Sequence, residues 1–186
     1  NYDNFPQSDI NAAIRSVKFL NNENKFFATM WSGHVVIWDA DKGEYLTRYL
    51  AHNSWVSDIN ITADDQTIIT SSSDQSIKIW DYDGFRLRST LTGHKNEIWS
   101  IALSDDENYI YSASKDTTVK QWDAKKVDVK SDVYPPDEDQ KYSSIINDGQ
   151  HYVTVSKSGQ ALVHSTDDLE VVYTFSGNEN YRYITF

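Results

Sequence analysis

The chain has 186 residues, of which 39% are hydrophobic and 13% aromatic, and it contains no cysteine. Neither a disulfide framework nor a thiolate metal site is therefore possible. The net charge of −11, from 28 acidic and 17 basic residues, argues against binding to the nucleic-acid phosphate backbone, which requires a basic face. No apolar stretch approaches the roughly 18 residues of a membrane-spanning helix, so a membrane is not expected as a partner either.

The N-terminal sequence, residues 1–6, has neither the basic start nor the apolar core of a signal peptide. An intracellular, cytoplasmic location is therefore expected, with a nuclear one left open.

A period of 42 residues runs through the sequence. One four-membered column of apolar positions follows it, at Tyr49, Leu91, Val133 and Phe175. A fixed period in this range indicates a repeat architecture. Tryptophan–aspartate pairs recur at the same interval, at Trp38-Asp39, Trp80-Asp81 and Trp122-Asp123.

Each period holds four short apolar runs separated by clusters of turn residues. Around the third tryptophan–aspartate pair, in chain order, the runs are Leu87–Leu91, Ile98–Leu103, Tyr109–Ala113 and Thr118–Trp122. Alternation of period two bounded by turns predicts antiparallel strands. The unit is therefore predicted to be a four-stranded meander.

The second and third units resemble the WD-repeat β-propeller family. The matching segments are Ala51-His52…Asp74…Trp80-Asp81 and Gly93-His94…Asp116…Trp122-Asp123. In that family a histidine, a strand hydroxyl, a turn aspartate and a tryptophan form a hydrogen-bonded tetrad inside each blade. The resemblance implies two structural tetrads: His52, Asp74 and Trp80 with Thr70 or Ser72, and His94, Asp116 and Trp122 with Ser112 or Ser114.

The outer units depart from this pattern. The first has Asp9-Ile10 at the Gly-His position, Ala28 for the hydroxyl and Ser32 for the turn aspartate. The fourth replaces the same elements by Pro135-Pro136, Ser158 and His164-Ser165. The resemblance thus covers nearly the whole chain, but only two of four units carry the tetrad.

The expected fold is all-β, a propeller of four-stranded antiparallel blades. The blades are expected at 12–52, 53–94, 95–136 and 137–178, with 179–186 opening a fifth, all in a single partial propeller over 1–186. Rings of the family typically have seven blades, so the four present are expected to be part of a larger ring. The alternative is a closed four-bladed ring, in which the strand at 12–20 packs against 181–186.

Large side chains occupy rim positions that the fold does not require. Trp31 shares its repeat column with Ser73 and Lys115, and Trp55 shares one with Glu97. Exposed tryptophan and arginine near one another are typical of interface hot spots. The alternative is that neighbouring loops cover each of them. The residues expected to bind a partner, with Glu97 adjusting specificity, are Arg15, Trp31, Trp55, Glu97, Trp99 and Tyr183.

Acidic residues gather in the turns expected at the opposite face. They are Asp64-Asp65, Asp105-Asp106-Glu107 and Asp148 in one set of turns, and Asp39, Asp41, Asp81, Asp83 and Asp123 in the other. The simpler interpretation is that aspartate suits turns and stays hydrated. The alternative is a docking surface for a basic peptide.

No catalytic or metal-binding constellation emerges. His34, His151 and His164 show no metal-ligand spacing, and no serine stands in a G-x-S-x-G setting. No catalytic residue, metal, cofactor or small-molecule substrate is therefore expected. The resemblance implies a non-catalytic scaffold that presents a rigid propeller rim to a protein or peptide partner. The alternative is a sensor or regulatory propeller of a larger signalling ATPase or protease whose catalytic part is absent here.

Overall fold

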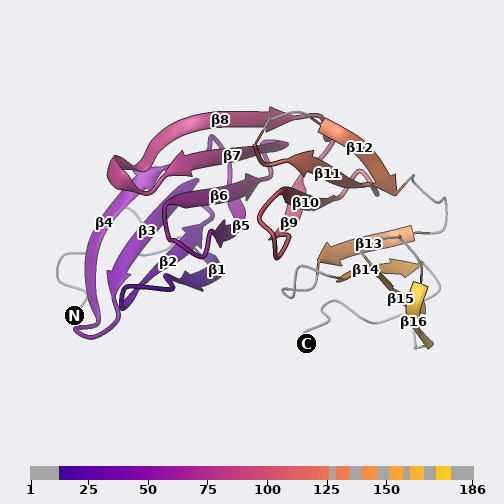
Figure 1. Ribbon diagram of the computed structural model, residues 1–186, viewed down its shortest axis with the longest axis horizontal. Coiled ribbons are helices and arrows are strands. Elements are labelled where there is room, and N and C mark those ends of the chain that lie inside the picture. The colour runs from indigo at the N-terminus through magenta and orange to yellow at the C-terminus, as the bar shows by residue number, and fades with distance from the viewer. Residues whose placement is uncertain are drawn as a thin grey trace. The chain divides into compact units, whose positions relative to one another are not determined.

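The computed structural model describes residues 13–125, 129–134, 140–145, 151–156, 160–165 and 171–176. The chain divides into two compact units, Asn1–Gly93 and His94–Phe186, and each is described by itself. In the described part every regular element is a β-strand except a 3-10 turn over Asp83–Phe85 (Figure 1). The expectation of an all-β fold is confirmed.

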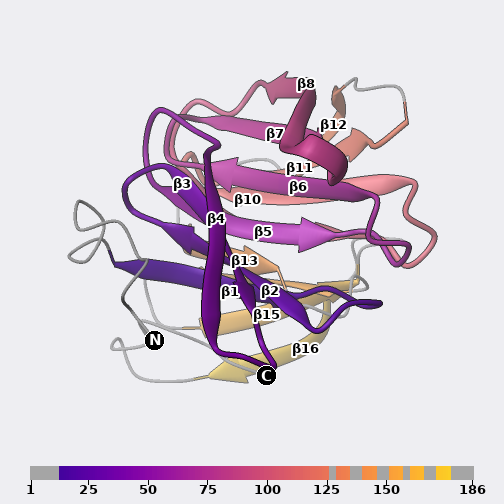
Figure 2. The same cartoon turned by 90° about the vertical axis from the view of Figure 1, so that its left-hand side faces the viewer.

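The first unit contains two antiparallel meanders of four strands. One sheet has the order β1 (Ile14–Phe19), β2 (Lys25–Met30), β3 (His34–Asp39) and β4 (Glu44–Leu50). The other has the order β5 (Val56–Ile61), β6 (Thr67–Ser72), β7 (Ser76–Asp81) and β8 (Arg86–Thr92). In Figure 2 the strands β5, β6 and β7 lie side by side, as their pairing requires.

The second unit repeats the same topology twice. Its first sheet pairs β9 (Ile98–Leu103), β10 (Tyr109–Ser114), β11 (Val119–Asp123) and β12 (Val129–Tyr134). Its second sheet pairs β13 (Gln140–Ile145), β14 (His151–Ser156), β15 (Gln160–Ser165) and β16 (Val171–Ser176). Each of the four sheets lies within one of the ranges expected from the 42-residue period.

A continuous apolar core joins the two sheets of the first unit. Phe27 and Val35 from one sheet and Ile68 from the other are fully buried in it. Burying such a side chain contributes roughly 1.5–3 kcal/mol. Aromatic stacking extends this core outward, because Phe85 stacks on Tyr49 at 4.4 Å and on Trp80 at 4.8 Å between ring centroids. The two sheets are therefore held in a fixed relation, which fixes the loops at their ends.

Asp65 also ties the two sheets together. It adopts a left-handed backbone conformation (φ 58°) in the β5–β6 turn and is buried. Its carboxylate accepts the backbone N–H and the side-chain amide of both Asn21 and Asn22, at 2.7–3.0 Å. Burial raises the pKa of Asp65, but these hydrogen bonds outweigh it and hold the pKa below its usual value. The interpretation of this turn as merely solvated charge is wrong for Asp65.

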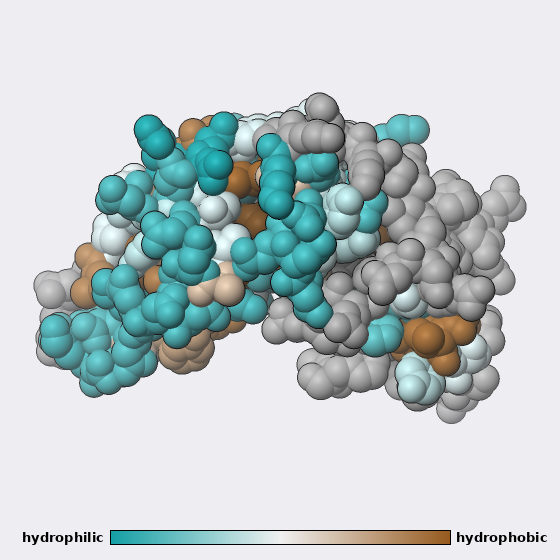
Figure 3. Space-filling model, viewed as in Figure 1, coloured by the Kyte–Doolittle hydropathy of each residue, from teal (hydrophilic) through white to brown (hydrophobic). Residues whose placement is uncertain are grey.

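The remaining acidic turns of the first unit lie at the same end of its strands. The turn between β5 and β6 and the turn between β7 and β8 lie next to each other there, since Tyr82 N donates to Gln66 O at 2.9 Å. Asp81 pairs with Arg86 at 2.6 Å and with Arg88 at 3.3 Å, so part of the negative charge is compensated. Hydrophilic side chains cover much of the described surface in this view (Figure 3).

One face of the first sheet is open at β1. Val17 and Phe19 occupy the repeat positions of Ile59 and Ile61, yet both are more than half exposed while the isoleucines are buried. The residues 181–186, on which the choice between a partial and a closed ring depends, lie outside the described residues. No helix among the described residues is long and apolar enough to cross a membrane.

Candidate functional site

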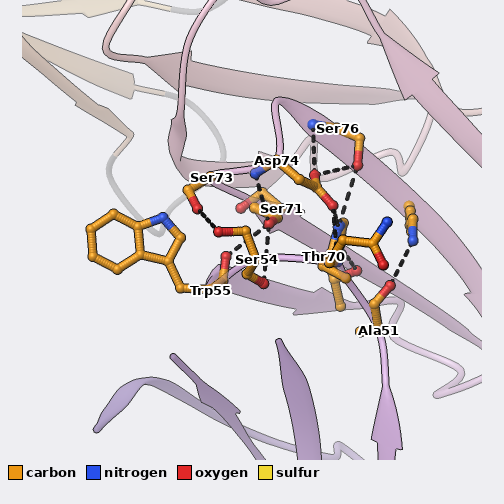
Figure 4. A network of polar contacts seen from close by, with 12 residues as sticks. Ala51, Ser54, Trp55, Thr70, Ser71, Ser73, Asp74 and Ser76 are labelled. Carbon is orange, nitrogen blue, oxygen red and sulfur yellow. Dashed lines mark hydrogen bonds and ion pairs between the residues drawn. The ribbon is translucent and has the colours of Figure 1, made fainter. Parts of the chain in front are cut away.

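A hydrogen-bonded set of four side chains crosses the second sheet of the first unit. Figure 4 shows two of its members, Thr70 and Asp74, within the surrounding polar network. His52 Nδ1 lies 2.9 Å from Asp74, and its Nε2 lies 2.8 Å from Thr70 Oγ1. Trp80 Nε1 donates to the same hydroxyl oxygen at 2.9 Å. One proton arrangement satisfies every group: Nδ1 of the histidine donates to the carboxylate, and the hydroxyl donates to Nε2 while accepting from the indole.

The same arrangement recurs in the second unit. His94 Nδ1 lies 2.8 Å from Asp116 and its Nε2 lies 2.7 Å from Ser112 Oγ, to which Trp122 Nε1 donates at 2.7 Å. His94 and Trp122 are buried. The sequence allowed two hydroxyls for each set, and in the structure the one nearer the strand centre takes part, Thr70 in one set and Ser112 in the other.

The two other hydroxyls hold the rim loops. Ser72 Oγ donates to the carbonyl of Trp55 at 2.8 Å, and Ser114 Oγ donates to the carbonyl of Glu97 at 2.8 Å. Each of these hydroxyls lies at the end of its strand, beside the loop that leads into the first strand of the same sheet. The tetrad strands therefore fix the backbone of two residues expected to bind a partner.

Two further hydroxyls belong to these networks and were not expected. Ser76 Oγ donates to Asp74 at 2.6 Å, and Thr118 Oγ1 donates to Asp116 at 2.7 Å. Both stand two residues after the turn aspartate and 42 residues apart. This repeated hydroxyl position could have been found in the sequence and would have predicted that both residues belong to the networks.

The carboxylates of the two networks have lowered pKa values. Burial raises the pKa of Asp74, but hydrogen bonds from His52 and Ser76 outweigh it and hold the pKa well below its usual value. The pKa of Asp116 is lowered in the same way, with burial opposed by its histidine and threonine neighbours. Both groups therefore stay ionised in the folded protein at pH values where they are protonated in the unfolded chain.

Stability is expected to fall in acid because of these two groups. A lowered folded pKa stabilises the fold above the unfolded value of about 4, and this contribution is lost as the pH falls below it. Each carboxyl adds a slope of up to about 1.4 kcal/mol per pH unit in this window. Denaturant unfolding between neutral pH and pH 3 measures the slope, and Asp116→Asn should reduce it.

The matched control for this experiment is Asp105→Asn, which makes the same change in net charge at an exposed position. If both variants change the acid dependence equally, general charge and not the tetrad is responsible.

The first sheet stabilises its tryptophan without a tetrad. Ala28 stands at the hydroxyl position and is buried, so the indole of Trp38 has no hydroxyl there. Trp38 instead stacks on Phe26, with ring centroids 6.2 Å apart, and meets the edge of Tyr45 at 6.1 Å. In the fourth sheet His164 takes the tryptophan position and is buried.

Three residues expected at the rim meet in the first unit. The indoles of Trp31 and Trp55 lie 4.9 Å apart between ring centroids and are nearly perpendicular (81°). The guanidinium of Arg15 lies 6.0 Å from the centroid of the Trp55 ring. Trp31 is 51% exposed, Trp55 is half-buried and Arg15 is exposed. These three residues are called the aromatic rim below, and Figure 4 shows the Trp55 indole pointing away from the polar network.

Backbone hydrogen bonds fix the aromatic rim. Trp31 N donates to Ala13 O at 3.0 Å, beside Arg15 at the start of β1. The carbonyl of Gly33, in the turn after Trp31, accepts the N–H of both Ala51 and His52 at 3.0 Å. The turn that carries one indole is therefore bonded to the loop that carries the other.

The other residues expected to bind a partner belong to the second unit. Glu97 forms an ion pair with Lys115 at 3.1 Å, and Lys115 N donates to the Glu97 carbonyl at 2.9 Å. Trp99 is half-buried in β9. Tyr183 lies outside the described residues.

Candidate metal ligands do not cluster in the described part of the chain. No group of three or more histidine, aspartate or glutamate side chains that could hold a metal ion occurs there. The serine run at 71–73, at the end of β6, forms structural hydrogen bonds: Ser71 Oγ lies 3.0 Å from Ser57 Oγ, and Ser73 Oγ lies 2.6 Å from Ser54 Oγ.

Four-stranded antiparallel meanders with a repeated His–hydroxyl–Asp–Trp network define a blade-type repeat protein. The family described as WD domain, G-beta repeat matches residues 43–81 and 85–123, so these two stretches, which hold both tetrads, are WD repeats. The first match runs from β4 through β7, so the sequence repeat takes the last strand of one sheet and three strands of the next. No curated protein matches the chain. WD repeats are generally protein-interaction scaffolds and typically non-catalytic.

Proposed function

We propose that this chain is a non-catalytic scaffold and that a protein or peptide partner docks on the aromatic rim. The observation that supports this most is the perpendicular pair of indoles, one of them more than half exposed, at a position where the equivalent repeats carry serine, lysine and glutamate. Leaving apolar area in water costs roughly 25 cal/mol per Å², so folding alone does not favour this pair.

The rigidity of the rim supports the same proposal. The turn and loop that carry the indoles are joined through Gly33 and held by the core beneath them. A fixed binding surface loses little conformational entropy when a partner docks. In the second unit Glu97 and Trp99, at the repeat positions of Trp55 and Ser57, extend the proposed partner-binding set.

The proposal is tested by affinity capture with the whole chain and with the double variant Trp31→Ala, Trp55→Ala. Tryptophan hot spots contribute 2 kcal/mol or more, so we expect captured partner to fall by about tenfold or more. The matched control is Leu46→Ala with Leu50→Ala, which removes exposed apolar area from the edge strand β4.

The acidic turns offer the rival surface. Asp105→Lys with Asp106→Lys reverses charge at two exposed positions in one of these turns. If this pair releases the partner while the tryptophan pair leaves it bound, the aromatic rim is not the binding face.

A further inference from the structure

The charge of the aromatic rim is opposite to that of the protein as a whole. Arg15 is exposed, and no carboxylate among the described residues forms an ion pair with it. At the acidic end of the same unit the arginines Arg86 and Arg88 are both paired with Asp81. The guanidinium of Arg15 faces the Trp55 ring instead, which leaves its planar fork of donors for another group.

The acidic turns of the first unit lie too far from Arg15 to pair with it. The acidic turns of the first unit lie at the opposite ends of strands of six residues, which span roughly 20 Å. The Debye length at physiological ionic strength is about 8 Å, so those exposed charges are largely screened at the rim. Nearer carboxylates are engaged in the fold: Asp74 belongs to the tetrad, and Asp58 accepts from Ser16 Oγ at 3.0 Å.

We propose that the rim recognises an acidic peptide segment, in which an aspartate or glutamate pairs with Arg15 and a neighbouring apolar side chain fills the corner between Trp31 and Trp55. A carboxylate matches the guanidinium fork and forms short charge-assisted hydrogen bonds. The perpendicular indoles offer one ring face and one ring edge to an apolar side chain. A basic segment fits less well, because the cation already over Trp55 repels a second one. This inference rests on the proposed function.

The test is selection from a random peptide library on the full chain, after which each enriched peptide is titrated against the full chain and against the variant Trp31→Ala, Trp55→Ala. We expect the enriched peptides to carry an acidic residue beside an apolar one. Their affinity should fall by about tenfold or more for Arg15→Gln, because a charged hydrogen-bonding partner is lost. Arg86→Gln removes the same charge at the acidic end and should leave the affinity unchanged. Arg15→Glu should restore binding to a peptide whose acidic residue is replaced by lysine.

The outcomes separate the two proposals. Peptides that depend on the tryptophans, but are neutral or basic and indifferent to Arg15→Gln, would overturn the acidic partner and leave the aromatic rim as the binding face. Peptides that bind equally to the tryptophan variant would overturn the rim itself. Thermal unfolding of Arg15→Gln verifies that the exposed substitution leaves the fold intact.

Discussion

Asp116→Ala should lower the free energy of unfolding by about 2–3 kcal/mol, because it leaves the buried His94 Nδ1 without its acceptor. The carboxylate also accepts Lys95 N at 2.8 Å and Thr118 Oγ1 at 2.7 Å, so one substitution removes several bonds from one turn. Denaturant unfolding followed by tryptophan fluorescence measures the effect. Trp122 lies in the same network and reports on it directly.

The control is Asp105→Ala in the preceding turn. Asp105 is exposed, and a surface substitution of this kind typically changes stability by less than about 0.5 kcal/mol. Asp74→Ala, at the repeat position in the first unit, should match Asp116→Ala. Equal unfolding midpoints for Asp116→Ala and Asp105→Ala would show that the network contributes nothing beyond an ordinary turn carboxylate.

The strands of the middle repeats were predictable because two independent signals coincide. Apolar alternation places strands at Ile98–Leu103 and Tyr109–Ala113, and the structure has β9 at Ile98–Leu103 and β10 at Tyr109–Ser114. The 42-residue period then transfers each assignment to the neighbouring repeat. The repeat column at the outer strand, Tyr49, Leu91 and Val133, is followed less exactly by the strand pairing. Tyr49 and Leu91 face Val35 and Ile77, but in the third sheet Val119 faces Tyr134 and not Val133, because the ladder is irregular there.

The tetrad hydroxyl could not be chosen from sequence because the two candidates in each strand are two residues apart. Residues at i and i+2 of a strand point to the same face, so alternation treats Thr70 and Ser72 alike. The two hydroxyls differ in their position along the strand. Trp80 pairs with Ile68 across the two strands, and its indole reaches the hydroxyl of Thr70, two residues beyond Ile68. Which hydroxyl the indole reaches depends on the register between the two strands, and the repeat pattern alone does not determine that register.

The burial of Asp65 was hidden for a different reason. Its partners Asn21 and Asn22 belong to another repeat, and the corresponding positions one period later are Ala63 and Asp64. A contact that occurs in only one repeat produces no periodic pattern in the sequence. The tryptophans of the aromatic rim could be singled out from the sequence, because the equivalent repeat positions carry polar residues. Their contact with Arg15 could not be predicted, because it depends on the three-dimensional fold.

Gly33→Ala should be among the most damaging single substitutions in the first unit. Gly33 has φ +83°, and an added Cβ would overlap the backbone oxygen of His52 and lie 3.0 Å from that of Ser54. A left-handed conformation alone costs a non-glycine residue about 1–2 kcal/mol. The overlap adds about 1–3 kcal/mol, because backbone atoms must shift to relieve it.

Gly43→Ala separates these two costs. Gly43 also has a left-handed backbone (φ +63°), but nothing lies within 4 Å of an added Cβ, so only the conformational cost of about 1–2 kcal/mol should appear. The difference in unfolding free energy between the two variants measures how tightly the Trp31 turn is pressed against the His52 loop. Because these segments carry the two indoles, Gly33→Ala should also weaken partner capture while Gly43→Ala leaves it unchanged. Equal destabilisation by the two alanines would mean that the turn yields freely, and the rim would then lack the rigidity on which its proposed role depends.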